Sequence, residues 1–224
     1  MYLRGERMQK RIILSRLFIV VLVMIAVHKY IADSSFADKY VAFADETVST
    51  GSNIVCQIDG NIDNSYADMV EVELNMIPTE LRTEFVESGY HIYVTEENLA
   101  KEYYGGGRYD RIFGVIFYDK DLILISGYEY AIKEATVHEF GHWFDQYLGY
   151  ASSSRDFAMI YSSERPRFSK AFYGRCSTQE IQEYFAEAFY VYIKAPQLLR
   201  QVAPQTYAYM NYHVQLVIVN EEKI

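Results

Sequence analysis

Apolar residues along the chain are spaced first as in short strands and later as in helices. Three apolar runs rich in β-forming residues occur at His91–Thr95, Ile112–Tyr118 and Leu122–Ser126. The last two flank the three-residue connection 119–121, which is typical of a hairpin. Because strands come first and helices follow, the pattern predicts an α+β domain with a small mixed or antiparallel sheet rather than a parallel α/β fold.

Helical spacing dominates after Gly127. The apolar residues there recur every three or four positions up to Gly149: Ala131, Ala135, Val137, Phe140, Phe144 and Leu148. A second strong helix is expected over 179–194, where Ala195-Pro196 ends it. Closing helices are expected over 197–202 and 206–219, and 150–178 is expected to be a loop with one short helix near 156–162.

Shorter elements precede the hairpin. Two helices are expected, the first from Tyr66 to just before Pro78 and the second from Pro78 to the stop at Gly89. A brief helix is expected over 96–104. Residues 38–65 are polar and weakly periodic, so we expect a loosely structured lead-in to a single domain spanning 66–224.

Residues 1–37 have the pattern of an export signal. Basic residues at positions 4, 7, 10, 11 and 16 precede the apolar run Leu17–Val27, which is shorter than the roughly 20 residues of a membrane-spanning helix. We expect a cleaved signal peptide and a secreted protein. The alternative is an uncleaved anchor that holds the domain outside the membrane, and this segment would then be the protein's only contact with the bilayer.

Composition excludes some partners. The chain has 21 Lys and Arg against 30 Asp and Glu, a formal net charge of -9, so nucleic acid is not an expected partner. Two cysteines, Cys56 and Cys176, are too few for a disulfide scaffold and lack the paired spacing of a structural zinc site. They could form one bridge or remain thiols.

The helix after Gly127 contains the pattern HExxH at His138-Glu139-Phe140-Gly141-His142. Residues four apart are neighbours on one helix face, so both imidazoles can bind one metal ion. Glu139 projects beside them and can act as the general base toward a zinc-activated water. The sequence therefore predicts a catalytic zinc site on this helix.

Catalytic zinc requires a third protein ligand. The helix expected over 179–194 offers Glu180, Glu183 and Glu187, which fall on one face at spacings of three and four residues. Three acids on one stripe of an aromatic helix would repel one another if they were buried without a cation. Spacing alone does not choose among the three.

These two motifs carry a resemblance to a known family. The run Val137–His142 with Asp145 behind it, followed by Glu183-Tyr184-Phe185-Ala186-Glu187-Ala188-Phe189, resembles the catalytic domain of anthrax lethal factor and its small secreted relatives, the Pro-Pro endopeptidases. The likeness covers most of residues 66–215. It implies a zincin-like fold and a secreted zinc endopeptidase of the gluzincin type, with one catalytic Zn²⁺ and a protein or peptide substrate.

The resemblance also implies roles for individual residues. His138, His142 and Glu183 would be the zinc ligands, and Glu187 would orient a ligand imidazole. Tyr173, in the run Tyr173-Gly174-Arg175, would donate to the developing oxyanion, although it lies three residues further from the glutamate motif than the family pattern has it. Asp145 could also support the zinc site, or it could be an ordinary acid on the helix surface.

Specificity is predicted less directly. Zinc peptidases of this kind bind substrate as an added strand at a sheet edge, and one strand of the hairpin over 112–126 is the expected edge. The small secreted relatives imply cleavage between prolines in surface or extracellular proteins. The alternatives are a toxin-like metalloprotease with another protein specificity, and a catalytically silent zinc-binding interaction module.

Overall fold

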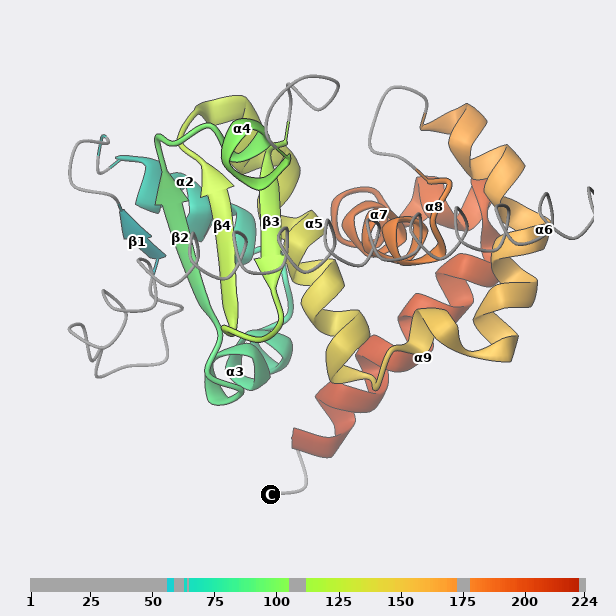
Figure 1. Cartoon of the computed structure of the whole chain (residues 1–224). Coiled ribbons are helices and arrows are strands. Elements are labelled where there is room, and N and C mark those ends of the chain that lie inside the picture. Colours follow the sequence, from blue (N-terminus) through green and yellow to red (C-terminus); the bar gives the residue numbers. More distant parts are fainter. Residues whose placement is uncertain (1–55, 59–62, 64, 105–111, 173–177, 222–224) are drawn as a thin grey trace, which may run out of the picture.

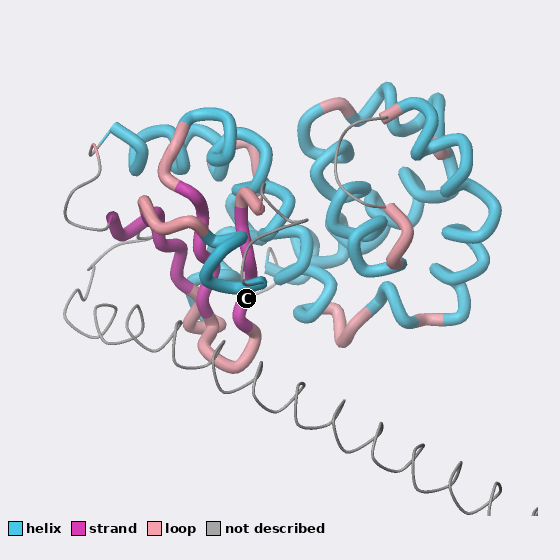
Figure 2. Tube along the Cα trace, turned by 45° about the horizontal axis from the view of Figure 1, so that its top comes forward, coloured by secondary structure: helices cyan, strands magenta, loops and turns pink. Residues whose placement is uncertain are grey.

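The computed structural model describes residues 56–58, 63, 65–104, 112–172 and 178–221. The strands gather on one side of the molecule and the C-terminal helices on the other, and one long helix lies between them (Figure 1). A second view shows the same division (Figure 2). The expected α+β fold with a small mixed sheet is therefore confirmed.

The sheet has four strands in the order β1-β2-β4-β3. Strands β1 (Cys56–Ile58), β2 (His91–Thr95) and β4 (Leu122–Ser126) run parallel to one another. Strand β3 (Gly114–Phe117) pairs antiparallel with β4, with Val115 opposite Leu124. The hairpin is thus present as expected, and β3 ends the strand order on the side of the long helix.

Strand β1 lies within the segment 38–65, for which the sequence predicts a loosely structured lead-in. Residues 56–58 pair in parallel register with residues 92–94 of β2. Three residues are too few for a periodic signal, and a strand of this length exists only through its neighbour. The described sheet therefore begins before the predicted domain boundary at residue 66.

The helices agree closely with the sequence pattern in all but one case. Their bounds are α2 Ser65–Leu74, α3 Thr79–Glu87, α4 Leu99–Tyr104, α5 Glu129–Tyr147, the short 3₁₀ turn η1 Ala151–Ser153, α6 Arg155–Ala171, α7 Ile181–Lys194, α8 Pro196–Val202 and α9 Pro204–Glu221. None of the helices in the described part of the chain combines the length and apolarity needed to cross a bilayer.

Helix α6 is the exception, because the sequence pattern predicts a loop with one short helix near 156–162, whereas 17 residues are helical. The helix continues through the exposed Pro166, which removes one backbone hydrogen bond. Tertiary packing compensates, since Phe157 and Phe168 are fully buried against Tyr184 of α7. Buried Glu164 also accepts hydrogen bonds from Thr206, through the backbone N–H and the hydroxyl, each at 2.8 Å.

Helices α5 and α7 form the centre of the core. Their aromatic side chains interleave, with the Phe140 and Phe189 rings 5.9 Å apart and the Phe144 and Phe189 rings 5.2 Å apart. These rings are fully buried. Because aromatic burial contributes most of the packing energy in such a core, the two helices are held in one fixed crossing.

Candidate active site

Helix α5 presents the two histidines of the HExxH motif side by side. The imidazole rings of His138 and His142 lie 4.9 Å apart, almost perpendicular at 82°. Both residues are largely buried, with 8% and 7% of their surface exposed. One helical turn separates them, as the spacing of four residues requires. Both Nε2 atoms face the same third group.

Helix α7 supplies that group because it crosses α5 at very short range. The crossing occurs at Gly141, where an added Cβ would lie 2.9 Å from the carbonyl oxygen and 3.0 Å from the Cα of Ala186. Any larger side chain at this position would push the helices apart. A glycine inside HExxH and a small residue inside the glutamate motif thus set the distance between the two motifs.

The close crossing brings the Glu183 carboxylate to both imidazoles. Its Oε2 lies 3.4 Å from Nε2 of His138, and its Oε1 lies 3.4 Å from Nε2 of His142. Ligand atoms about 2.1 Å from a tetrahedral zinc ion are separated by roughly 3.4 Å from one another. One ligand atom from each of the three residues lies within 4.8 Å of the others, so the donor set fits a metal ion.

Electrostatics at Glu183 favour the ionised form that a metal ligand requires. Burial alone would raise the pKa of its carboxyl, but the facing imidazoles of His138 and His142 outweigh that effect and lower it well below the usual range. The side chain keeps 36% of its surface exposed, so the site is open on this side.

Glu187 approaches the opposite nitrogen of one histidine. Its Oε2 lies 3.4 Å from Nδ1 of His138, and the residue is only 2% exposed. A carboxylate on the second ring nitrogen fixes the tautomer and the direction of an imidazole ligand. Glu180 behaves differently, because it is exposed at the residue that precedes α7 and its side chain makes no capping hydrogen bond. The three glutamates that share one face of α7 therefore differ in their surroundings. Glu183 faces both histidines, Glu187 faces Nδ1 of His138, and Glu180 is exposed.

Glu139 belongs to α5, and its side chain packs against the edge strand β3. It is 6% exposed, and burial raises the pKa of its carboxyl, although the neighbouring His138 and His142 oppose that rise. A Cβ on Gly114 of β3 would lie 2.7 Å from Cγ and 2.9 Å from Oε1 of Glu139. Sequence reasoning missed Gly114, although an isolated glycine in an apolar strand often marks such a close approach.

Asp145 is buried rather than a solvated acid of the helix surface, with 2% of its surface exposed. Its two carboxylate oxygens accept hydrogen bonds from the backbone N–H of Ser152 at 2.7 Å and from the Ser152 hydroxyl at 2.5 Å. These bonds tie the turn after α5 to the helix end. Asp145 therefore holds Ser152, in the turn that follows α5, against the end of the helix that carries the two histidines.

Some predicted groups lie outside the described residues. Tyr173, the expected oxyanion donor, and Cys176 both belong to the segment 173–177, and residues 1–37 are outside as well. The role of Tyr173, a pairing of Cys56 with Cys176, and the export segment stay predictions.

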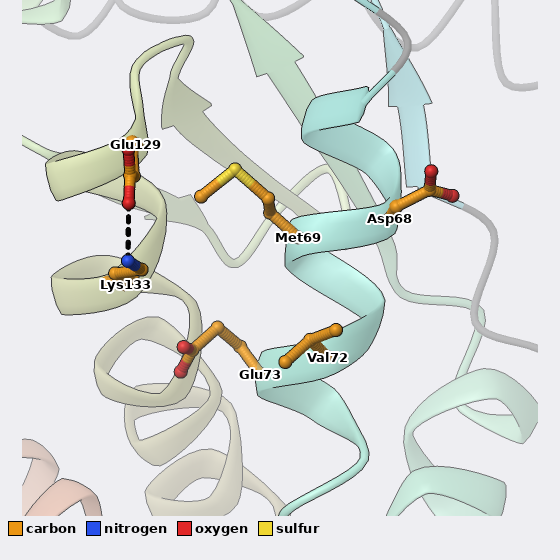
Figure 3. Close-up of a pocket in the computed structure, with 6 residues that line it drawn as sticks. All are labelled: Asp68, Met69, Val72, Glu73, Glu129 and Lys133. Carbon is orange, nitrogen blue, oxygen red and sulfur yellow. Dashed lines mark hydrogen bonds and ion pairs between the residues drawn. The ribbon is translucent and has the colours of Figure 1, made fainter.

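A cavity of about 390 Å³ lies away from these residues, between α2 and the first turns of α5 (Figure 3). Its lining combines Asp68, Met69, Val72, Glu73, Glu129 and Lys133. The Lys133 ammonium contacts Glu129 at 2.5 Å, and Glu73 forms an ion pair with Lys194. Glu129, Lys133 and Glu73 thus have ionic partners within the protein, and none of the HExxH residues lines this cavity.

Comparisons with known proteins identify the fold and the family. A solved structure described as the Pro-Pro endopeptidase PPEP-2 from Paenibacillus alvei superposes with a TM-score of 0.57 at 20% sequence identity, covering 70% of this chain and 96% of that chain. No curated protein sequence matches the chain. The profile described as "Anthrax toxin lethal factor, N- and C-terminal domain" matches residues 44–213, which include both motifs. The chain therefore belongs to the anthrax toxin lethal factor family.

Proposed function

We propose that this protein is a zinc-dependent endopeptidase that hydrolyses peptide bonds with Glu139 as general base. The observation that carries the proposal is the convergence of His138, His142 and Glu183 within 4.8 Å, beside a buried carboxylate on the same helix. Family membership and the fold shared with a Pro-Pro endopeptidase support a peptidase independently of that geometry.

The three converging residues would hold Zn²⁺ through two imidazole nitrogens and one carboxylate. Two histidines and a glutamate form a set typical of catalytic rather than structural zinc, which leaves one position for water or substrate. When bound there, zinc acts as a Lewis acid that polarises a carbonyl and lowers the pKa of a water molecule. Glu187 would keep His138 aligned through its Nδ1 atom.

Glu139 would perform the proton transfers. Its carboxylate accepts the proton as water attacks the scissile carbonyl, and then delivers it to the departing amine. Burial between α5 and β3 raises its pKa, which makes it a stronger base than a solvated glutamate. Tyr173 is proposed as the donor to the oxyanion, and its position lies outside the described residues.

Strand β3 is the proposed docking edge for the substrate. It pairs with β4 on one side and ends the strand order on the other. An extended peptide can therefore add to β3 through main-chain hydrogen bonds. Gly114 opens this strand directly beside Glu139, so a peptide on this edge passes the base and the zinc ligands.

We extend the proposal to secretion and to substrates rich in proline. Residues 1–37 support export, and the endopeptidase whose fold this chain shares is described as acting on Pro-Pro bonds. Surface or extracellular proteins with proline-rich segments would then be the targets.

The test is a peptide-library cleavage assay with the zinc-loaded protein, with cleavage sites identified by mass spectrometry. Chelation and Glu139→Ala should each abolish cleavage, but Glu139→Ala should retain zinc. Cuts between prolines would support the narrower specificity, and cuts elsewhere would indicate a toxin-like protease of other specificity. A zinc-loaded protein that cleaves no peptide would favour the silent binding module.

A further inference from the structure

We infer that Glu164 is a positioning residue for the proposed zinc site. Through Thr206 and Tyr184, it fixes the direction in which the Glu183 carboxylate points. This role depends on the proposed function, because Glu183 is one of the residues that would hold the metal ion. It follows from the place of Glu183 in its helix, and from a chain of buried hydrogen bonds that ends at the neighbouring residue.

Glu183 lies in the first turn of α7, where the backbone of a helix holds its own residues least firmly. The first N–H groups of a helix find no carbonyl partner within it. The backbone bonds of α7 begin with the Tyr184 N–H, which donates to the carbonyl oxygen of Glu180 at 3.0 Å. The Glu180 side chain adds no capping hydrogen bond. Contacts with other helices are therefore needed to hold this turn in place.

Tyr184 is held at its far end by α9. The residue is fully buried, and its hydroxyl lies 2.7 Å from the Thr206 hydroxyl. The Thr206 hydroxyl donates in turn to Oε2 of Glu164 at 2.8 Å. A threonine hydroxyl has a single proton, so Tyr184 is the donor in its bond with Thr206. The hydrogen bonds therefore run in one direction, from Tyr184 through Thr206 to Glu164.

The Glu164 carboxylate is fixed by further donors. It is 1% exposed and accepts hydrogen bonds from the backbone N–H groups of Thr206 at 2.8 Å and Gln205 at 3.1 Å. These groups belong to the first turn of α9, where the helix dipole favours a negative charge. Arg167 also contacts the carboxylate, at 3.3 Å. Glu164 thus joins α6 to the start of α9 and keeps the Thr206 hydroxyl pointed toward itself.

Helix α6 also holds the residues just before α7, which contacts α5 as well as α6 and α9 (Figure 1). The Tyr161 hydroxyl donates to the carbonyl oxygen of Gln179, and the Tyr161 and Tyr184 rings meet edge to face with centroids 5.2 Å apart. The bond to Gln179 fixes where α7 begins. The bond from the Tyr184 hydroxyl fixes how α7 is rotated about its axis.

Rotation of α7 matters because a metal ion tolerates little displacement of its ligands. Side chains of a helix extend to about 5–6 Å from its axis, so a rotation of about 10° would move the Glu183 carboxylate by about 1 Å. Metal–ligand distances vary by only about 0.2 Å. The buried chain of hydrogen bonds therefore helps to keep Glu183 at its distance of 3.4 Å from both imidazoles.

The test removes these hydroxyls and measures zinc affinity by competition titration, together with the absorption spectrum of the cobalt(II)-loaded protein, which reports coordination geometry. Tyr184→Phe keeps the buried ring, and Thr206→Val keeps the branched shape of the side chain. We expect each variant to weaken zinc binding on the order of tenfold, as loss of a group behind a ligand does, and to change the cobalt spectrum. Thr206→Ser keeps a hydroxyl and should restore both to wild-type values.

Glu164→Gln should weaken zinc binding in the same way, because an amide cannot accept all of the hydrogen bonds that the carboxylate accepts. If this variant does not fold, Thr206→Val still interrupts the connection between Glu164 and Tyr184. The double variant Tyr184→Phe/Thr206→Val should weaken zinc binding no further than Thr206→Val alone, since both changes interrupt one chain. Additive losses would overturn that chain.

Tyr192→Phe is the matched control, because Tyr192 also lies on α7 and its hydroxyl also donates to α9, to Oδ1 of Asn211 at 3.2 Å. It lies about two and a half turns beyond Glu183. Tyr192→Phe and Tyr184→Phe should both lower the thermal midpoint of the chelated protein. Only Tyr184→Phe should weaken zinc binding and change the cobalt spectrum.

Wild-type zinc affinity in Tyr184→Phe, or equal losses of affinity in Tyr184→Phe and Tyr192→Phe, would overturn the positioning role and leave the proposed peptidase intact. Zinc binding without cleavage of any peptide would overturn the peptidase, while the titrations still decide the positioning role. A wild-type protein that binds no zinc would overturn both.

Discussion

Gly114 and Glu139 are in such close contact that no side chain fits between strand β3 and the proposed general base. A Cβ at Gly114 would lie 2.7 Å from the Glu139 Cγ and 2.9 Å from the Cβ of Ala135. The proposed docking strand and the proposed base are thus in direct packing contact. This contact leads us to expect that a residue outside both motifs affects the chemistry.

Gly114→Ala should therefore impair catalysis without removing any reacting group. The added methyl group must displace either β3 or the Glu139 side chain, at a cost of about 1–3 kcal/mol in the free energy of unfolding. We expect kcat to fall at least about tenfold, because small misplacements of catalytic groups carry large rate penalties. Val115→Ala is the control, since Val115 packs against the smaller cluster on the opposite face. Equal activity of both variants would show that the contact is dispensable.

Gly141→Ala should weaken metal binding through the helix crossing. The methyl group would approach the Ala186 backbone at 2.9 Å, and α5 and α7 would have to separate. Glu183 would then lose its distance to both imidazoles. We expect weaker zinc affinity in competition titrations and a loss of about 1–3 kcal/mol in stability of the zinc-free protein. Unchanged zinc affinity would mean that the crossing tolerates the displacement.

Glu183→Ala and Glu180→Ala form a matched pair on one helix. Glu183 faces both histidines, whereas Glu180 is exposed at the start of α7. Removal of Glu183 should abolish tight zinc binding, and removal of Glu180 should leave zinc affinity within about twofold of wild type. Equal zinc occupancy in both variants would require a different third ligand.

Glu187→Gln should affect affinity less severely than loss of a ligand. Glutamine keeps the size of the side chain but removes the charge that faces Nδ1 of His138 at 3.4 Å. Loss of such a partner typically weakens metal affinity or activity about 10–100-fold. Zinc competition titrations and kcat measurements on the same preparations would test this, and an effect as large as that of Glu183→Ala would indicate direct ligation.

The raised pKa of Glu139 predicts a pH-dependent stability of the zinc-free protein. Its folded-state pKa lies above the ordinary 4.5, so the folded protein binds the proton more tightly than the unfolded chain. The contribution of this carboxyl to stability then falls as pH rises above about 4.5. Glu139→Gln should raise the thermal midpoint of the chelated protein at pH 7 and leave it nearly unchanged at pH 4. A constant difference between the two proteins across this range would contradict the assignment.

Several elements could be predicted from the sequence because their signals are local. The HExxH helix, the hairpin and helix α7 each extend over enough residues for hydrophobic periodicity to identify them. Strand β1 and helix α6 could not. The first is three residues long, and the second contains Pro166 but is held by aromatic and carboxylate contacts to α7 and α9.

The spacing of residues along the chain is enough to predict two imidazole ligands and a candidate base on one helix, with three candidate glutamates on a second helix. The packing of α7 against α5 distinguishes those glutamates: Glu183 faces both histidines, Glu187 lies behind one histidine, and Glu180 is exposed at the start of α7. The tertiary structure also places Gly114 behind Glu139 and the Tyr184 hydroxyl against that of Thr206. The physical reason is that spacing along a helix sets which side chains share a face, whereas distances between elements depend on how closely their backbones can pack.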